Sequence, residues 1–345
     1  MPPRRNPPAR TPARQVMSQS GWNEDKSKIA QAYPIKDMGE CKWILNMKVT
    51  RDRQRKTISL SQEAYIERVI TDFNLEQTRA AHTPAEKVIL TSIPSDGTPR
   101  IPLTKEQHER YRSLVGALLY AANTTRLDIA FQVGLLSRFL SDPCMHHLRA
   151  AHRVLNYLRL NPNIVAQFGA NASNTPPTVE AFLRGGTGHS MPVEAYSDAD
   201  WAGCPEERRS TSGGIIRFNG DIICWVSRRQ RTIALSSAES EYIALTEVTK
   251  EIRWVQQWIS EVLEVRTPGI INCDNQAAIM LTAADGIHER TKHFDLKVHF
   301  IRDQVEKKNI STKWVSSHDQ QADILTKPLD RANFLRLRDL IFKPI

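Results

Sequence analysis

The second half of the chain alternates short apolar runs with longer amphipathic stretches. Short apolar runs bounded by turn residues are typical of strands, and apolar positions spaced three and four apart are typical of helices. The expected strands are VEAYSD (193–198), GGIIRFNG (213–220), DIICWVSR (221–228), PGIINCD (268–274) and STKWV (311–315). Helices are expected at Ala238–Leu263, from Gln276, around Thr291–Lys307 and from Gln320. Hairpins followed by alternating strands and helices predict an α/β domain with a mixed five-stranded sheet and flanking helices.

A smaller, mostly helical α+β pattern precedes this domain. The runs CKWILNMKV and KTISLSQ, separated by the polar TRDRQR, predict a β-hairpin between Cys41 and Gln62. The apolar residues of 62–73 lie on one helical face, whereas residues 77–104 hold four prolines and predict a long loop. Three further helices are expected at Lys105–Ala122, Leu127–Leu140 and Met145–Leu160.

Three segments lie outside these patterns and set the domain boundaries. Residues 1–30 are a predicted disordered basic arm, because the first 20 residues hold five prolines, four arginines and no acid. Residues 166–191, with NASNTPPT and RGGTGHS, predict a linker, and residues 331–345 are assigned to a C-terminal tail. The two expected domains are therefore 38–165 and 192–330.

Composition indicates globular domains and argues against a secreted disulfide-rich protein and a membrane-spanning protein. Of the 345 residues, 40% are hydrophobic and 25% charged. The five cysteines are scattered and form no Cys-x-x-Cys pair, so no disulfide is expected. The longest apolar run, Leu114–Ala122, is far shorter than the roughly 20 residues of a membrane span.

The net charge of +9 favours a nucleic-acid partner, although its distribution is uneven. Residues 192–345 hold 21 Lys and Arg against 22 Asp and Glu, so the basic excess belongs to residues 1–191. We therefore expect the first half to contact phosphates and the second half to carry acidic chemistry.

Acids recur at matched positions in the second half. Asp198 ends the first expected strand, Asp274 ends the fourth, and Asp323 lies early in the last helix, five residues after His318. Each acid taken alone also fits a structural role, as a helix cap or a solvated turn residue. Their shared topological position favours a common site.

Helical phase selects a fourth acid, Glu241, in the long helix. It lies four residues before Leu245, on the apolar stripe, whereas Ser236 and Glu239 fit a capping box. A carboxylate on a buried face is costly unless a partner compensates it, and hard divalent cations are suited to that task. Two such ions clamp the attacking and leaving oxygens of a phosphodiester, so the acids indicate metal-assisted hydrolysis.

Several motifs strongly resemble the ribonuclease H domain of copia-type LTR-retrotransposon polyproteins. They are YSDADWAG, RRSTSGG, CWVSRRQRTIALSSAESEYIAL, CDNQAAI, RTKHFDLKVHFIRD and HDQQADILTKPL, within 192–330. Residues 38–160 resemble the end of that family's reverse transcriptase, in DMGECKWILNMKV, ISLSQEAYIERVI, YRSLVGALLYAANTTRLDIAF and LSRFLSDP. The chain is thus similar to the C-terminal part of such a polyprotein.

The resemblance implies a ribonuclease H-like fold and assigns roles to the acids. It implies that two Mg²⁺ ions, or Mn²⁺, are bound by Asp198, Glu241, Asp274 and Asp323. His318 is implied as the active-site histidine, and Asp200 remains the alternative to Asp198 as the first ligand. A zinc cluster of His293, Asp295 and His299 is a weaker alternative metal site, since these three residues do not make a tetrahedral set with a cysteine.

The expected activity is therefore metal-dependent endonucleolytic hydrolysis of the RNA strand of RNA/DNA hybrids. Nucleic acid and other retroelement proteins are the expected partners, inside the cell, in the cytoplasm or the nucleus. The alternative is a non-catalytic relic that folds and binds nucleic acid. Polymerisation is not expected, because the family's Tyr-x-Asp-Asp motif is absent and the chain holds no Asp-Asp dipeptide.

Overall fold

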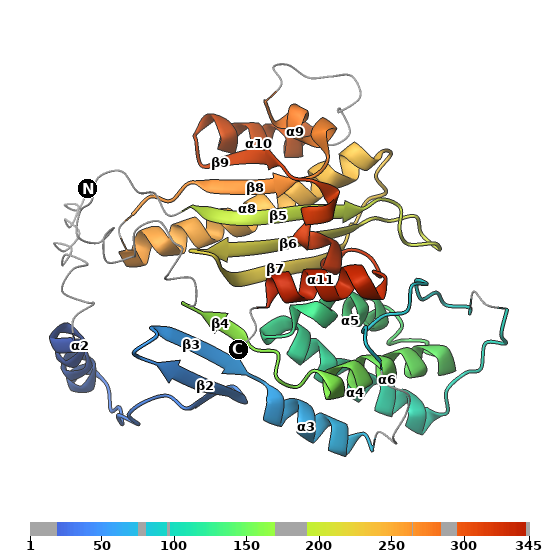
Figure 1. The fold of residues 1–345 in the computed structure, drawn as a ribbon, viewed down its shortest axis with the longest axis horizontal. Helices are drawn as coiled ribbons and strands as arrows, with labels where there is room; N and C mark the ends of the chain where they lie inside the picture. Colours follow the sequence, from blue (N-terminus) through green and yellow to red (C-terminus); the bar gives the residue numbers. More distant parts are fainter. Residues whose placement is uncertain are drawn as a thin grey trace, which may run out of the picture.

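Five strands of the second half form one mixed sheet in the computed structural model (Figure 1). They are β5 (Val193–Asp200), β6 (Thr211–Phe218), β7 (Asp221–Arg229), β8 (Gly269–Cys273) and β9 (Ile310–Trp314). The order is β7-β6-β5-β8-β9, with β5, β6 and β7 antiparallel and β8 and β9 added in parallel. The structure describes residues 19–74, 81–94, 97–169, 192–263, 265–283 and 295–342. The predicted α/β class and mixed five-stranded sheet are confirmed.

The sheet is covered closely on both faces where it carries the acids. Helix α8 (Ser237–Leu263) packs on one face, and the short 3-10 helix η4 (Gln321–Leu325) contacts β5 and β6. A Cβ at Gly214 of β6 would lie 2.5 Å from Cγ2 of Val248, and one at Gly213 would lie 2.5 Å from Cγ2 of Thr326. Glycine at both positions therefore allows α8 and the residues after η4 to approach β6.

Two more helices pack at the parallel edge of the sheet. These are α9 (Gln276–Ala283) and α10 (Asp295–Glu306), which contact β9 and each other (Figure 1). The core of this half joins the apolar stripe of α8 to the strands, with Ile252 and Ile259 fully buried beside Val193 and Ile271. The periodicity that predicted α8 is thus the pattern of its buried face.

The first half forms a small antiparallel sheet and a group of helices. The strands, in order, are β1 (Trp43–Ile44), β2 (Met47–Asp52), β3 (Thr57–Ser61) and β4 (Ala166–Phe168). The helices are α3 (Glu63–Asp72), α4 (Lys105–Thr124), η1 (Leu127–Ile129), α5 (Ala130–Ser137) and α6 (Met145–Leu160). The expected hairpin is formed by β2 and β3, but a turn at Leu45 and Asn46, both with positive φ, divides the run CKWILNMKV into the antiparallel strands β1 and β2. The expected helices are present, except that the helix predicted at 127–140 begins as a 3-10 turn and ends at Ser137.

A buried ion pair at η1 is hydrogen-bonded to α6. The side chains of Arg126 and Asp128 are both 0% exposed, and the guanidinium donates to the two carboxylate oxygens at 3.0 and 2.8 Å. The Tyr157 hydroxyl donates to the same carboxylate at 2.6 Å, and Arg126 donates to the carbonyl of Asn161 at 2.8 Å. Every charge in this buried network therefore has a partner, as buried charges require.

The structure corrects three predicted boundaries. Helix α2 (Gln19–Ala32) occupies the end of the segment 1–30 that was predicted to be disordered, because the proline-rich composition stops before Ser20; residues 1–18 lie outside the described residues. Strand β4 lies at the start of the predicted linker, where Ala166 pairs with Leu60; residues 170–191 are not described.

The predicted C-terminal tail, residues 331–345, contains a helix instead. Helix α11 (Arg331–Ile341) places Phe334, Leu337 and Ile341 in the core of the first half, where the rings of Phe334 and Tyr157 lie 5.6 Å apart. The same core contains Ile215 from β6 and Leu325 from η4. The two halves therefore share one apolar core, and the segment 331–341 belongs to it.

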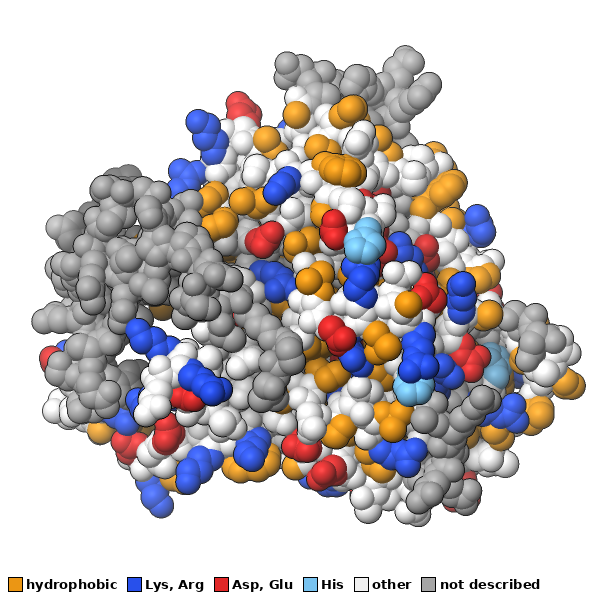
Figure 2. Space-filling view, viewed as in Figure 1, with side chains coloured by type: hydrophobic (Ala, Val, Ile, Leu, Met, Phe, Trp, Pro, Cys, Tyr) orange, Lys and Arg blue, Asp and Glu red, His pale blue; other side chains and the backbone are white. Residues whose placement is uncertain are grey.

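The surface of the protein carries charges of both signs (Figure 2). Lys and Arg side chains alternate with acids over the face seen in Figure 2 and form no single basic patch there. All five cysteines lie within the described residues and are free. Among the described helices, none is both long and apolar enough to cross a membrane.

Candidate active site

Asp198 occupies the centre of the acidic group, near the end of β5. Its side chain is almost completely buried, and Oδ2 accepts a hydrogen bond from the Thr326 hydroxyl. The ammonium of Lys327 lies 3.8 Å from the same oxygen. Strand pairing places Asp198 opposite Gly213, the residue whose missing side chain lets Thr326 approach. The packing of η4 against β6 thus fixes the surroundings of Asp198.

Glu241 enters the site from α8, where helical phase predicts it. Only 6% of it is exposed, and within the described part of the chain Oε2 has no hydrogen-bond partner. Burial, followed by the charges of Asp198 and Asp274, raises the pKa of Glu241. A buried acid with an unpartnered oxygen carries a free-energy cost, so this position fits a cation better than it fits a structural role.

Glu239, the competing acid of α8, has the structural role that the sequence predicts. Its backbone N–H donates to the Ser236 hydroxyl at 3.2 Å, and its carboxylate accepts from the backbone N–H of Leu235 at 2.7 Å. The capping interaction therefore reaches one residue further back than in a standard capping box.

Asp274 follows β8 and faces Glu241. Glu241, Cys273 and Asp274 each offer a ligand atom, and these atoms lie within 4.8 Å of one another. The Ser317 hydroxyl donates to Oδ2 of Asp274 at 2.7 Å. The helix cap of α9 is provided by Asn275, whose Oδ1 accepts from Ala278 N at 3.0 Å. The structural role considered for Asp274 thus belongs to its neighbour.

Asp323 lies in η4 and joins the group through Asp198. Burial, followed by the charge of Asp198, raises the pKa of Asp323. Lys327 lies 2.8 Å from Oδ1 of Asp323. Burial acts to lower the pKa of Lys327, but the carboxylates of Asp198 and Asp323 outweigh it and raise that pKa. The ammonium is therefore held in its charged form between two acids.

Asp200 and His318 lie at the margin of the group. Asp200 is two residues after Asp198 and so shares its face of β5; burial is the main cause that raises its pKa to about 6. His318 is exposed, and its Nδ1 lies 3.1 Å from the carboxylate of Asp319. The backbone next to it is held at the site, because the adjacent Ser317 donates a hydrogen bond to Asp274.

The donor set fits a divalent cation. Carboxylate oxygens are the ligands that Mg²⁺ prefers, and the oxygen of Glu241 without a partner would gain one. A cation would also relieve the mutual repulsion that raises the pKa values of Glu241 and Asp323. An acidic cluster of this kind is suited to metal-assisted attack on a phosphodiester.

The sequence did not predict four residues that contact the acids. Ser317 and Cys273 adjoin predicted residues in the chain, and Thr326 and Lys327 follow Asp323 by three and four positions, but none of the four side chains gave a periodic or spacing signal. The weaker zinc alternative is only partly visible: His299 pairs with Asp295 at 3.4 Å, and His293 lies outside the described residues.

Transposon polyproteins are similar to most of this chain. The retrovirus-related Pol polyprotein from transposon TNT 1-94 of Nicotiana tabacum is 34% identical over 324 residues, 92% of this chain and 22% of that protein. The polyprotein from transposon RE1 of Arabidopsis thaliana is 34% identical over 307 residues, 89% of this chain and 19% of its own length. The chain thus spans about a fifth of the length of these relatives.

Other proteins match parts of the chain. Secreted RxLR effector protein 161 of Plasmopara viticola is 46% identical over 145 residues, 42% of this chain and 90% of that protein. Among solved structures, LC11-RNase H1, isolated from compost, is 14% identical with a TM-score of 0.32, covering 39% of this chain and 93% of its own. The same protein in complex with an RNA/DNA hybrid has a TM-score of 0.31 over the same shares. No protein-family model matches the chain.

Proposed function

Because the chain belongs to the copia-type retrotransposon Pol polyproteins, we propose that its second half is a metal-dependent endonuclease. Its substrate would be the RNA strand of an RNA/DNA hybrid, and its partners nucleic acid and other retroelement proteins. The observation that carries this proposal is the position of Glu241. Its carboxylate is buried beside Asp198 and Asp274, with one oxygen lacking a partner among the described residues.

The proposed ligands of two Mg²⁺ ions, replaceable by Mn²⁺, are four carboxylates: Asp198, Glu241, Asp274 and Asp323. Such ions, when bound, supply charge stabilisation for the attacking and leaving oxygens of the displacement. The protein itself shields these acids from bulk water and fixes the positions of their side chains. Thr326 and Ser317 do this by donating hydrogen bonds to Asp198 and Asp274. We assign proton exchange with the departing product to His318, which is exposed.

The first half would hold the hybrid. It carries the basic excess of the chain, while the half with the acids has a balanced charge. Lys and Arg contact phosphates without reading sequence, and hybrid duplexes are recognised mainly by shape and 2′-hydroxyl contacts. We therefore expect binding that weakens with salt and shows little base preference.

The test is cleavage of an RNA/DNA hybrid, labelled on the RNA strand, by the full chain in Mg²⁺. Asp274→Asn keeps the shape of the side chain but removes its charge. We expect it to lower the cleavage rate by more than about 10–100-fold, the loss typical when a side chain that is hydrogen-bonded to a metal ligand is removed. The matched control is Asp303→Asn on α10, whose carboxylate pairs with Lys307 at 2.7 Å and which should cleave as the wild type does.

Two other outcomes of this experiment would contradict the proposed function. Equal cleavage by wild type and Asp274→Asn would refute the assignment of the acids. Binding of the hybrid without cleavage in Mg²⁺ or Mn²⁺ would favour the non-catalytic alternative instead. Polymerisation by this chain is not expected, since it has no Asp-Asp dipeptide, and primer extension on an RNA template should yield no product.

A further inference from the structure

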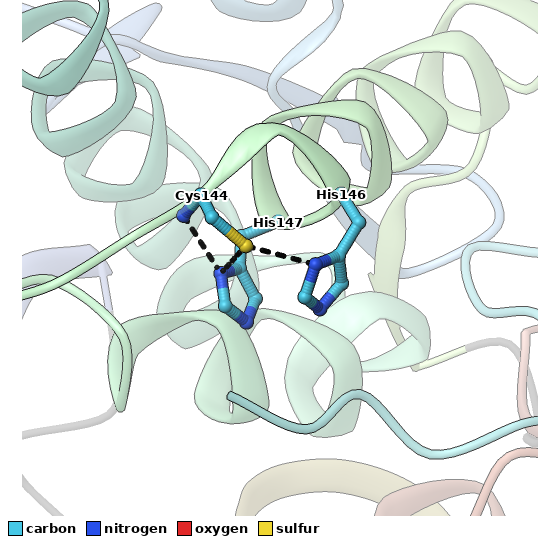
Figure 3. A group of neighbouring side chains, drawn as sticks. All are labelled: Cys144, His146 and His147. Atoms are coloured by element: carbon cyan, nitrogen blue, oxygen red, sulfur yellow. Dashed lines mark hydrogen bonds between the residues drawn. The ribbon is translucent and has the colours of Figure 1, made fainter. Parts of the chain in front are cut away.

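A second group of metal-ligating side chains lies in the first half, at the beginning of α6. Cys144, His146 and His147 offer ligand atoms that lie within 4.8 Å of one another. Figure 3 shows both imidazole rings turned toward the sulfur, with Nδ1 of His146 at 2.9 Å and Nδ1 of His147 at 3.4 Å from Sγ. Cys144 and His147 are fully buried, whereas His146 is partly buried, so the group meets solvent at His146.

The hydrogen bonds of the two rings fix which nitrogen carries the lone pair. Nε2 of His146 and Nε2 of His147 both contact the carbonyl oxygen of Thr91, at 2.8 and 3.0 Å. A carbonyl only accepts, so both Nε2 atoms carry a hydrogen, and in the neutral rings both Nδ1 atoms are left as acceptors. A backbone carbonyl bound to the far nitrogen is also the usual orienting partner of a metal-ligating histidine.

The contacts of His147 agree with this assignment, because this ring is fully buried and each of its nitrogens has a hydrogen-bond partner. Its Nδ1 accepts the backbone N–H of Cys144 at 3.0 Å. A neutral imidazole with an unprotonated nitrogen facing a thiol is the form that binds a metal.

The spacing of the three atoms matches a tetrahedral ion. Zinc binds sulfur at about 2.3 Å and imidazole nitrogen at about 2.0–2.1 Å, so a tetrahedral angle separates the two ligand atoms by about 3.5 Å. The separation of 3.4 Å between Sγ and Nδ1 of His147 has this value, and the 2.9 Å to His146 needs a small opening. Thiolate and imidazole together select zinc over hard cations such as Mg²⁺.

We propose that Cys144, His146 and His147 bind one zinc ion at the beginning of α6, with both rings oriented by the carbonyl of Thr91. On binding, the thiol of Cys144 loses its proton to solvent, the thiolate takes a coordination position, and Nδ1 of His147 exchanges the Cys144 N–H for the ion. The fourth position is open to water.

The probe is Co²⁺ added to the chelator-treated full chain, because a thiolate ligand gives Co²⁺ a near-ultraviolet charge-transfer band that carboxylates do not give. We expect this band at one equivalent, reversed by zinc. Cys144→Ser should abolish it, and His146→Ala should weaken the affinity at least about tenfold. The control is Cys273→Ala, since Cys273 lies beside the acids and is the other thiolate near candidate ligands; this variant should keep the band.

Two results would overturn the proposal. One is a wild-type chain without the charge-transfer band, which would leave the three side chains as a hydrogen-bond network. The other is a band that survives Cys144→Ser and disappears in Cys273→Ala, which would place the ion at the acidic group. Far-ultraviolet circular dichroism checks that each variant folds; His146, which is only partly buried, provides the test should Cys144→Ser fail to fold. At the same zinc concentration, the thermal midpoint should also rise more in the wild type than in His146→Ala.

Discussion

The ammonium of Lys327 lies 2.8 Å from the carboxylate of Asp323, four residues earlier in the chain. It also lies 3.8 Å from Oδ2 of Asp198, so one side chain offsets the charge of two acids. A protein that gathers carboxylates for metal binding must also fold before the metal arrives, and unpaired buried charges would oppose folding. Lys327 is therefore an internal counter-ion, which the proposed divalent cation would partly replace.

Lys327→Met should expose this role. Without the ammonium the acids repel each other more strongly, so the metal-free variant should lose about 1–2 kcal/mol in its free energy of unfolding, a modest value because the side chain is 35% exposed. Saturating Mg²⁺ should restore more stability to the variant than it adds to the wild type, since the ion no longer competes with Lys327. Urea unfolding in chelator and in Mg²⁺ measures both quantities.

The matched control for Lys327 is Lys307→Met. Lys307 pairs with Asp303 across the same four-residue spacing, at 2.7 Å, but on an exposed helix surface. Its loss should cost about 0–1 kcal/mol and leave the effect of Mg²⁺ unchanged. Equal gains from Mg²⁺ in Lys327→Met and in the wild type would show that Lys327 does not share its position with the ion.

The raised pKa of Asp200 makes stability depend on pH. In the folded protein that pKa is about 6, against 3.8 for an ordinary aspartate. Between these values the folded protein keeps a proton that the unfolded chain has released, so the free energy of unfolding falls as pH rises from about 4 to 6. Asp200→Asn cannot titrate. In chelator, it should reduce that fall by about 1–3 kcal/mol, measured by urea unfolding at a series of pH values.

The control for this pH series is Asp142→Asn. Asp142 is 81% exposed and pairs with Arg100 on the surface of the first half. The variant should retain the wild-type slope between pH 4 and 6. If Asp200→Asn also retains it, the fall in stability comes from the other buried acids, Glu241 and Asp323, whose pKa values are raised too.

Local signals in the sequence predicted the sheet and the acids. The apolar stripe of α8 placed Glu241 on the buried face because helical phase is a property of neighbouring residues. The strand ends likewise placed Asp198 and Asp274 at corresponding positions of neighbouring strands. Such patterns determine which residues face inward before any tertiary contact is known.

Contacts between distant segments could not be predicted in this way. The role of Lys327 depends on Asp198, which is far away in the sequence, and β4 is a three-residue strand that exists by pairing with β3. The proposed zinc ligands of α6 are different, because Cys144-Met145-His146-His147 is a local sequence. It contains no pair of cysteines, and the tautomers of its histidines depend on Thr91, which is distant in the chain.

The sequence of helix α11 has the apolar periodicity of a buried helix. Phe334, Leu337 and Ile341 are spaced three and four apart, the period of a buried helical face, within the segment assigned to the tail. In the structure Leu337 is 1% exposed and packs in the core that both halves share. The end of the chain therefore contributes to the stability of the first half, although it is the second half that it follows in sequence.

Leu337→Ala tests this contribution to the shared core. Removal of the buried side chain should lower the free energy of unfolding by about 2–5 kcal/mol, through lost apolar burial and the cavity left behind. Leu340→Ala, on the same helix but 50% exposed, should change it by less than about 0.5 kcal/mol. Urea denaturation of the full chain followed by tryptophan fluorescence compares the two. Equal effects would mean that α11 does not pack against the first half, and the predicted tail would then be the better description of residues 331–345.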